Sequence, residues 1–376
     1  MSALEKATLL VDGAAAFEEI LRCIEQARRS ILINMFIWRG DCIGTRIARA
    51  VLQAAERGVQ VEISVDRVGM ILERCEESGC SFFHTDPGIG EQIKIRTLEI
   101  WYPKNRSRAE TVCTCRELAD RLLSHPNITV DKDRQKNDHS KYYIIDGEIL
   151  IFGGVNIEDK EGGSDCVGRV YQDYMLKLEG EEHVRAFLDK LERNQNTAAA
   201  YCFRMNNKTV SPAVFEMQDR FLAIINEAQQ ELVIVMAYFA PVPEICRAIV
   251  RAWERGVHIR ILIPENPNFQ NHSNRRTMRL LMKRSRDGIQ VMFSQKMIHT
   301  KLIYNEKTVM FGSCNITNRA FTTLGELDVE LKNEDIPVIR HLKASVAENF
   351  ALAQPVKEYS GIRYSPLAAW IEGCCN

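Results

Sequence analysis

The sequence predicts an α/β protein of two similar lobes, each a mixed, mostly parallel sheet flanked by helices. The first observation behind this prediction is that His139-Ser-Lys-Tyr-Tyr-Ile-Ile-Asp146 is echoed 160 residues later by His299-Thr-Lys-Leu-Ile-Tyr-Asn-Glu306. The second is that each copy leads into a small-residue loop ending in asparagine, Phe152-Gly-Gly-Val-Asn156 and Phe311-Gly-Ser-Cys-Asn315. Two copies with the same loop indicate a duplicated unit. The duplication predicts one active site between the two lobes, about a pseudo-two-fold axis.

A second repeated block precedes each motif and supplies the first elements of each lobe. Residues 36–66 and 238–264 each read as a strand, an amphipathic helix, a glycine and another strand. The glycines that follow the two helices, Gly58 and Gly256, suit left-handed C-caps. This order of elements is the βαβ signature of a parallel sheet covered by helices.

The spacing of the repeats locates an insertion and the lobe boundaries. The two glycines are 198 residues apart and the two histidines 160, so the first lobe carries 38 extra residues, at about 67–130. Polar residues at 194–200 and 205–212 read as a linker. The tail contains Pro366 and Trp370 and is expected to pack as a short terminal helix. The predicted parts are a first lobe at 1–195, a second lobe at 212–355 and a tail at 356–376.

The residue types of the motif suit chemistry at a phosphoryl group. Residues i and i+2 of a strand point to the same face, so each histidine is expected to project with the lysine that follows it. If the two lobes face each other, two imidazoles, two ammonium groups and two carboxamides converge. Cations and amides can hold phosphoryl oxygens, while one histidine attacks phosphorus and the other donates a proton. The candidate residues are His139, Lys141, Asn156, His299, Lys301 and Asn315.

Two carboxylates follow the loops and are candidates for orienting the histidines. Asp173 lies 17 residues after Asn156, and Glu326 lies 11 residues after Asn315. A histidine needs a partner that fixes its tautomer. We expect a crossed arrangement, in which Glu326 orients His139 and Asp173 orients His299. The alternative is that both are ordinary solvated acids beside strands.

The duplicated motif resembles the phospholipase D superfamily, whose signature is a duplicated His-x-Lys-x4-Asp with a Gly-Ser/Gly-x-Asn loop. The first copy matches fully, with Asp146 as the acid and Gly154 in the loop. The second has Ser313 in the loop, but Glu306 stands where the family has aspartate. In the family this acid supports the loop rather than reacting, so the substitution concerns local geometry more than mechanism. The resemblance covers nearly the whole chain.

The resemblance also implies an activity. It implies a covalent phosphohistidine intermediate, with His139 as the nucleophile and His299 as the acid. From the residue types themselves we expect no cofactor and no metal, because fixed cations can do what Mg²⁺ does elsewhere. Residues 36–66, 152–157 and 172–173 look most like bacterial cardiolipin synthases, which move a phosphatidyl group from a phospholipid to an alcohol such as phosphatidylglycerol. The alternatives are a hydrolytic phospholipase D, a phosphodiesterase or nuclease of the same superfamily and, more remotely, an inactive membrane-binding scaffold.

Charge and aromatic residues suggest where such a protein would meet its substrate. The net charge of −1 gives no global basic field that would favour nucleic acid. Residues 275–286 nevertheless hold six cations and no acid. They are either a surface for lipid headgroups or phosphate, or a solvated helix with Met278, Leu281 and Met282 on its apolar face. The candidate surface residues are Arg275, Arg276, Arg279, Lys283 and Arg284, with Trp101 and Tyr102 of the insertion.

The remaining composition bears on location and metals. The sequence shows neither a signal peptide nor the ~20 apolar residues of a membrane span. We expect a cytoplasmic, peripherally membrane-associated protein whose partners are a phospholipid substrate and an anionic membrane, with nucleic acid less favoured and no obligate protein partner. The twelve cysteines are expected to be reduced. Four of them, with a nearby histidine, could ligate zinc, although their spacings are unusual: Cys75, Cys80, Cys113, Cys115 and His84.

Overall fold

The computed structural model describes residues 4, 6–75, 81–83, 88–101, 115–134, 136–162, 170–198 and 200–374. Its contacts divide the chain into two compact units. The N-terminal unit comprises Leu10–Tyr171 and Met175–Val184. The C-terminal unit comprises Met1–Leu9, Gln172–Tyr174 and Arg185–Asn376.

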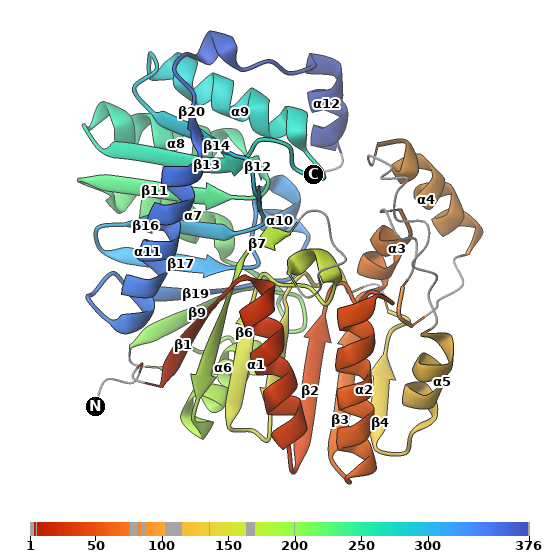
Figure 1. Ribbon diagram of the computed structural model, residues 1–376. Coiled ribbons are helices and arrows are strands. Elements are labelled where there is room, and N and C mark those ends of the chain that lie inside the picture. Colours follow the sequence, from red (N-terminus) through yellow and green to blue (C-terminus); the bar gives the residue numbers. More distant parts are fainter. Residues whose placement is uncertain are drawn as a thin grey trace. The chain divides into compact units, whose positions relative to one another are not determined.

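The N-terminal unit is built on a seven-stranded sheet in the order β1-β8-β6-β5-β2-β3-β4 (Figure 1). Its strands are β1 (Ala7–Val11), β2 (Ser30–Met35), β3 (Gln60–Val65), β4 (Ile128–Asp131), β5 (Tyr142–Ile145), β6 (Ile149–Gly153) and β8 (Tyr174–Glu179). Its helices are α1 (Asp12–Gln26), α2 (Cys42–Glu56), α3 (Arg67–Cys75), α4 (Ile89–Trp101) and α5 (Arg116–Ser124), with the 3₁₀ turn η2 (Asp159–Glu161). The last three of the α-helices belong to the predicted insertion.

The C-terminal unit is built on a nine-stranded sheet in the order β10-β9-β19-β17-β16-β11-β13-β14-β20. Its strands are β9 (Tyr201–Asn207), β10 (Val214–Phe215), β11 (Glu231–Met236), β13 (His258–Pro264), β14 (Gln290–Ser294), β16 (Lys301–Asn305), β17 (Thr308–Gly312), β19 (Glu326–Lys332) and β20 (Gln354–Pro355). Its helices are α7 (Met217–Glu227), α8 (Pro243–Glu254), α9 (Asn271–Arg284), α10 (Asn318–Thr322), α11 (Pro337–Leu352) and α12 (Pro366–Cys374), and α6 (Glu181–Arg193) leads into it.

Helices α7, α8 and α9 share one core on one face of the sheet, and α11 covers the other face (Figure 1). The short pairs β12 (Phe239–Ala240) with β18 (Ile316–Thr317), and β7 (Tyr171–Gln172) with β15 (Met297–Ile298), lie outside the large sheets.

The mixed α/β architecture is confirmed, but the expectation of mostly parallel sheets is wrong. Within the described parts of the two large sheets, parallel pairing is confined to β2-β3-β4 and β11-β13-β14, and the other pairs around the motif strands are antiparallel. The short pair β12-β18 is also parallel. The reason is the length of the connections. A crossover helix such as α2 returns the chain in the same direction, whereas the turn at residues 146–148 between β5 and β6 is too short for a crossover and reverses it.

In both units the repeated upstream block forms the helix, the glycine and the second strand that the sequence predicts. The strand expected at residues 36–38 is wrong, because β2 ends at Met35. Gly58 and Gly256 follow α2 and α8 with φ of 97° and 90°, which a residue with a side chain adopts at a cost. The arginine before each glycine has a matching role. Arg57 donates to backbone carbonyls at the end of α1, and Arg255 does the same at the end of α7. A cation there satisfies carbonyls that lack an intrahelical partner and opposes the negative end of the helix dipole.

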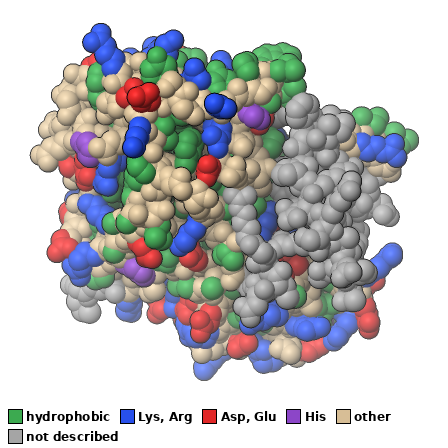
Figure 2. All heavy atoms as spheres, turned by 45° about the horizontal axis from the view of Figure 1, so that its top comes forward, with side chains coloured by type: hydrophobic (Ala, Val, Ile, Leu, Met, Phe, Trp, Pro, Cys, Tyr) green, Lys and Arg blue, Asp and Glu red, His purple; other side chains and the backbone are tan. Residues whose placement is uncertain are grey.

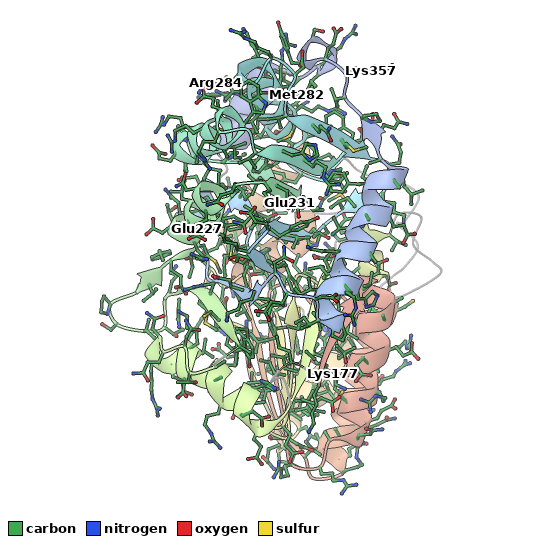
Figure 3. All side chains as sticks on the ribbon, turned by 90° about the vertical axis from the view of Figure 1, so that its left-hand side faces the viewer. Lys177, Glu227, Glu231, Met282, Arg284 and Lys357 are labelled. Carbon is green, nitrogen blue, oxygen red and sulfur yellow. The ribbon has the colours of Figure 1, made fainter. Side chains whose placement is uncertain are left out.

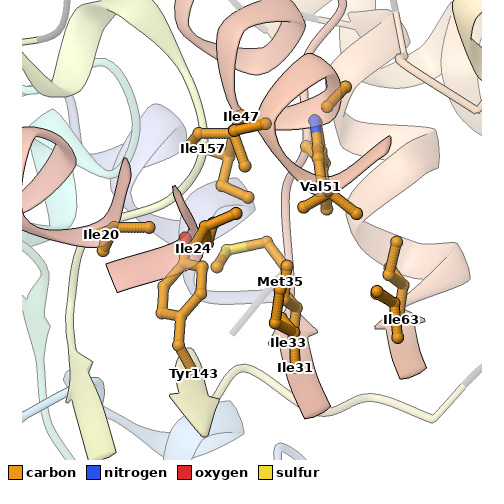
Figure 4. Close-up of a cluster of buried hydrophobic side chains, with 14 of the residues drawn as sticks. Ile20, Ile24, Ile31, Ile33, Met35, Ile47, Val51, Ile63, Tyr143 and Ile157 are labelled. Carbon is orange, nitrogen blue, oxygen red and sulfur yellow. The ribbon is translucent and has the colours of Figure 1, made fainter. Parts of the chain in front are cut away.

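The cores explain why the amphipathic helices form where they do. Helix α2 begins at its N-cap Asp41, whose side chain accepts from the N–H of Gly44. Ile47 and Val51, one helical turn apart, are then buried against the sheet beside Ile33 and Ile63 (Figure 4). Burying one such side chain stabilises the fold by about 1.5–3 kcal/mol. The core therefore holds β2, which pairs with β5 of the first histidine motif.

The expected polar linker at 205–212 is partly wrong. β9 (Tyr201–Asn207) is paired along its length with β19 inside the nine-stranded sheet. Asn206 is buried because its amide donates to the carbonyl of Ala320 and its oxygen accepts from Met217 N–H. Asn207 likewise donates to the carbonyl of Leu191. Polar residues that satisfy buried backbone groups read as a loop in the sequence, although they occupy a strand.

Other expectations concern the insertion and the tail. The terminal helix is confirmed as α12, and among the described helices none is long and apolar enough to cross a bilayer. Cys115 is buried, with its Sγ 3.9 Å from the carbonyl of Phe82. Cys80, His84 and Cys113 lie outside the described residues, as do the side chains of Cys75, Trp101 and Tyr102.

Candidate active site

The first histidine motif lies just before β5 in the N-terminal unit. His139 and Lys141 flank one ring: the imidazole meets Phe36 edge-on at 4.8 Å, and the ammonium of Lys141 lies 5.3 Å from the centre of the same ring. Lys141 is fully buried and donates to the carbonyl of His139. The imidazole and the ammonium are thus held together by the strand and by Phe36.

A hydrogen-bond network fixes the backbone on either side of His139. The Asn34 amide donates to Asp138 (3.0 Å) and to Ser140, and Asp66 accepts from the N–H of Asp138 (2.9 Å). Burial raises the pKa of Asp66, while the backbone N–H groups that donate to its carboxylate oppose the shift. The sequence analysis did not place these residues in the site. The signal for Asn34 was available, because it interrupts an otherwise apolar strand.

The second motif is fully described within the C-terminal unit. The Nδ1 of His299 lies 3.0 Å from a carboxylate oxygen of Asp173, and the ammonium of Lys301 lies 3.0 Å from the same oxygen. The ammonium also lies 3.0 Å from that Nδ1 and donates to the carbonyl of His299, as Lys141 does to His139. All three residues are at most 5% exposed.

The electrostatics of this trio assign its protons. Burial alone would raise the pKa of Asp173, but Lys301 and His299 beside it lower the pKa below its usual value. An ionised carboxylate accepts from both donors, so we assign the Nδ1 of His299 as protonated toward Asp173. Lys301 places a fixed positive charge next to Asp173.

Gln172 and Thr300 fasten the Asp173 segment to the histidine motif. The N–H of His299 donates to the carbonyl of Gln172 (2.8 Å), and the hydroxyl of Thr300 donates to the Gln172 side chain (3.0 Å). The N–H of Tyr174 donates to Asp173 itself (2.9 Å). These contacts position the carboxylate. The sequence analysis named Asp173 as the residue that orients His299, but it did not assign a role to Gln172 or Thr300.

Strand register shows that Asp173 and Glu326 occupy equivalent positions. Gly153 pairs with Met175 in the N-terminal repeat, and Gly312 pairs with Asp328 in the C-terminal repeat. The acid lies two residues before the paired residue in both cases. Glu326 is buried and accepts from the hydroxyl of Ser313 (2.5 Å). Its expected role in orienting His139 stays a prediction.

The loop asparagines are buried in both units. Asn156 is 3% exposed, and its amide lies 3.5 Å from Glu161; Gly154 of the same loop is buried too. Asn315 is 5% exposed and accepts from the N–H of Tyr238 (3.3 Å). His139, Lys141 and Asn156 therefore belong to the N-terminal unit, whereas Asp173, His299, Lys301, Asn315 and Glu326 belong to the C-terminal unit.

Buried acids behind Asn156 were missed by the sequence analysis. Glu158 forms a buried ion pair with Arg39 (2.5 Å). Asp159 accepts from the N–H of Ile43 (2.8 Å) and donates its own N–H to Asp41 (2.7 Å). Burial and the neighbouring Asp159 raise the pKa of Asp41 to about 7. These contacts tie the end of the Asn156 loop to the start of α2.

The motif acids accept hydrogen bonds from the backbone before the central strand of each unit. Asp146 accepts from the backbone N–H groups of residues 28, 29 and 30, at the start of β2. Glu306 accepts from the N–H groups of Gln229 and Gln230, just before β11. The longer side chain thus reaches the equivalent backbone. Burial opposes ionisation at both positions, but the backbone donors prevail and lower both pKa values.

We expect Glu306→Gln to lose about 0.5–1.5 kcal/mol of stability at neutral pH, because an uncharged amide accepts more weakly from the two N–H groups. The folded pKa of Glu306 is lowered, so its contribution exists above the unfolded pKa of ~4.3 and disappears as the pH falls through the folded value. Urea midpoints of both proteins should therefore differ at pH 7 and converge below about pH 4. Glu306→Asp should have only a small effect on activity. A large rise in turnover on this substitution would instead indicate that the second motif is degenerating.

The predicted basic helix is α9, and its cations fall into two groups. Met278, Leu281 and Met282 are fully buried, which confirms the apolar face. Arg275 stacks on Phe293 and Arg279 donates to the carbonyl of Ile362, so both are engaged within the unit. The other predicted surface residues, Arg276, Lys283 and Arg284, are exposed.

Known proteins of similar sequence carry the name cardiolipin synthase. The chain is 24% identical over 372 residues to cardiolipin synthase A of Pseudomonas aeruginosa, covering 91% of this chain and 67% of that protein. It is 24% identical over 386 residues to cardiolipin synthase 1 of Bacillus cereus, covering 93% and 67%. Among solved structures, a phosphatidylserine synthase from Haemophilus influenzae aligns over 98% of this chain and 92% of its own with a TM-score of 0.70 at 12% identity, so it shares the fold.

A family model matches most of the chain in two blocks. The model is described as "Cardiolipin synthase, PLD-like domain" and matches residues 20–193 and 221–349. The first block contains His139, Lys141 and Asp173, and the second contains His299, Lys301 and Glu326. With the duplicated motif and its matched supports, this match shows that the chain belongs to the cardiolipin synthase family of PLD-like proteins.

Proposed function

We propose that the protein is a phosphatidyltransferase of the cardiolipin synthase type, acting through a covalent phosphohistidine. The single observation that carries the proposal is the buried trio of Asp173, His299 and Lys301. It presents an oriented imidazole beside a fixed cation, which suits both proton transfer and an anionic phosphoryl group. The names of the similar proteins point to the same reaction.

The proposed first step cleaves the donor lipid. The Nε2 of His139 attacks phosphorus, a P–N bond forms and the P–O bond to the headgroup alcohol breaks. His299, as an imidazolium, donates its Nε2 proton to the leaving oxygen, so the alcohol departs neutral. Asp173 stabilises the imidazolium through Nδ1. Lys141, Lys301, Asn156 and Asn315 would hold the phosphoryl oxygens, and Glu326 would orient His139.

The proposed second step resolves the intermediate. His299, now neutral, takes the proton of the acceptor hydroxyl, the hydroxyl oxygen attacks phosphorus and the P–N bond breaks. With phosphatidylglycerol as the acceptor the product is cardiolipin; with water it is phosphatidic acid. The same two steps would cleave a nucleic-acid phosphodiester if the site admitted one. The names of the relatives favour the lipid acceptor over these alternatives.

The test is mass spectrometry of the products formed from phosphatidylglycerol vesicles, with and without EDTA. We expect cardiolipin and glycerol in equal amounts, unaffected by EDTA because fixed cations serve the phosphoryl group, and absent with His139→Ala. Phosphatidic acid as the sole product would make the protein a hydrolase. No lipid product, with cleavage of single-stranded DNA or RNA instead, would refute the transferase in favour of a nuclease.

A further inference from the structure

We propose that α12 and the basic helix α9 together form a docking surface for an anionic phospholipid bilayer. Helix α12 presents Leu367 and Trp370 to solvent, with 68% and 63% of their surfaces exposed. The two residues are three positions apart, so they project from the same side of the helix. Tryptophan and leucine are the side chains that interfacial helices place at the boundary between headgroups and acyl chains.

The opposite side of α12 is fixed to α9. Ala369 is buried, and its carbonyl accepts from the hydroxyl of Ser273 (3.2 Å). The carboxylate of Glu372 accepts from the N–H groups of Ser273 (2.6 Å) and His272 (3.3 Å) in the first turn of α9. Those N–H groups have no partner within α9 itself, and the negative charge suits the positive end of the helix dipole. The exposed apolar pair is therefore carried by an anchored helix.

The surroundings of the apolar pair are strongly basic. Residues 271–286 and 357–374 contain eight lysines and arginines against two acids, a net charge of +6. The whole chain has a net charge of −1, so the rest sums to −7. Figure 3 places Arg284 and Lys357 on either side of Met282 at the same end of the unit. Figure 2 shows hydrophobic side chains at the upper edge of the view, with lysines and arginines beside them.

This combination favours a bilayer over other anionic partners. Exposed cations such as Arg276, Lys283, Arg284 and Arg363 attract any polyanion. A nucleic acid, however, gains nothing from an exposed leucine, whereas an anionic bilayer offers headgroup charge and an apolar layer at once. A mixed apolar and basic surface is complementary to both layers.

The docking surface is also connected to the site by described contacts. Asn274 of α9 is fully buried, donates to the carbonyl of Ala237 (2.9 Å) and accepts from the N–H of Phe239 (2.7 Å). Between them lies Tyr238, whose ring centre is 6.2 Å from that of His299. A bilayer held by α12 and α9 would thus bind to the helix that supports the His299 motif.

The inference rests on the proposed function, because a phosphatidyl donor lies in such a surface. It is tested with the inert His139→Ala protein, so that binding is measured without turnover. We expect this protein to float with vesicles of equal parts phosphatidylcholine and phosphatidylglycerol, but not with phosphatidylcholine alone. Adding Leu367→Ser and Trp370→Ser should weaken binding about tenfold or more. Emission of the parent should shift to shorter wavelength on binding, and Trp370→Phe should remove that shift.

Phe215→Ser is the matched control, because Phe215 is 38% exposed on β10, at the sheet edge opposite β14 and β20. It should leave binding unchanged, and thermal unfolding should show that every variant is folded. Equal binding by the Leu367/Trp370 variant, or binding to single-stranded DNA in place of vesicles, would overturn the inference. If the wild-type protein turns over detergent-dispersed phosphatidylglycerol but the protein does not bind vesicles, only the docking surface is refuted. If the protein binds vesicles but the wild type shows no turnover, only the proposed function is refuted.

Discussion

His299→Asn is expected to reduce turnover of phosphatidylglycerol by about 10³-fold or more, because it removes the group that exchanges a proton with both alcohols. The imidazole is buried and touches Asp173 and Lys301, which can still pair with each other after the substitution. The fold should therefore survive. Product formation by mass spectrometry gives the activity, and thermal unfolding gives the stability.

The comparison between the two histidines sharpens this result. If His139 is the nucleophile, a ³²P-labelled lipid should label His299→Asn covalently but should not label His139→Ala. A donor with a good leaving group, such as a nitrophenol ester, needs no proton from an acid and should restore much of the first step in His299→Asn. Labelling of His139→Ala instead of His299→Asn would reverse the assigned roles.

Asp173→Asn is expected to cost about 3–5 kcal/mol of folding free energy as well as turnover. Lys301 is 1% exposed, and the Asp173 carboxylate is the negative charge 3.0 Å from its ammonium. Removing one member of a buried pair leaves the other charge buried and uncompensated. His299 also loses the acceptor that holds its Nδ1 proton. Urea unfolding measures the first effect, and the product assay the second.

A double variant separates stability from catalysis. Asp173→Asn combined with Lys301→Met removes both charges and puts an apolar chain of similar length in the buried space. Replacing both members of a buried pair is often close to neutral, so much of the lost stability should return. Turnover should not return, because the oriented imidazole and the fixed cation are both gone. If Asp173→Asn is as stable as the parent, Asp173 and Lys301 do not form the buried charge pair described above.

The acid-stability prediction for Glu306 illustrates what the sequence already contained. The spacing of His139 to Asp146 and of His299 to Glu306 marked two equivalent turns, and both acids accept from the backbone that precedes the central strand. Such contacts depend on local spacing, which a duplicated sequence displays. The same holds for Gly58 and Gly256, whose left-handed caps follow from a helix ending before a strand.

The direction of the strands and the burial of polar residues were determined by the tertiary structure and not by local spacing in the sequence. The motif strands pair antiparallel because tight turns join them, and β9 lies in a sheet because Asn206 satisfies the backbone of Ala320 and Met217, more than 10 residues away in either case. A residue pattern reports which side chains are polar. It does not report which buried backbone groups those side chains will meet.

The sequence by itself determined the family, the two histidine motifs and their supporting acids, because each depends on residues close together in the chain. Only the tertiary structure decided that Lys301 shares the Asp173 carboxylate, which the sequence had already paired with His299, and that Gln172 and Thr300 hold it there. These partners are 126 or more residues apart in the chain. Their pairing is fixed by the packing of the C-terminal sheet and by the cost of leaving a buried charge without its counterion.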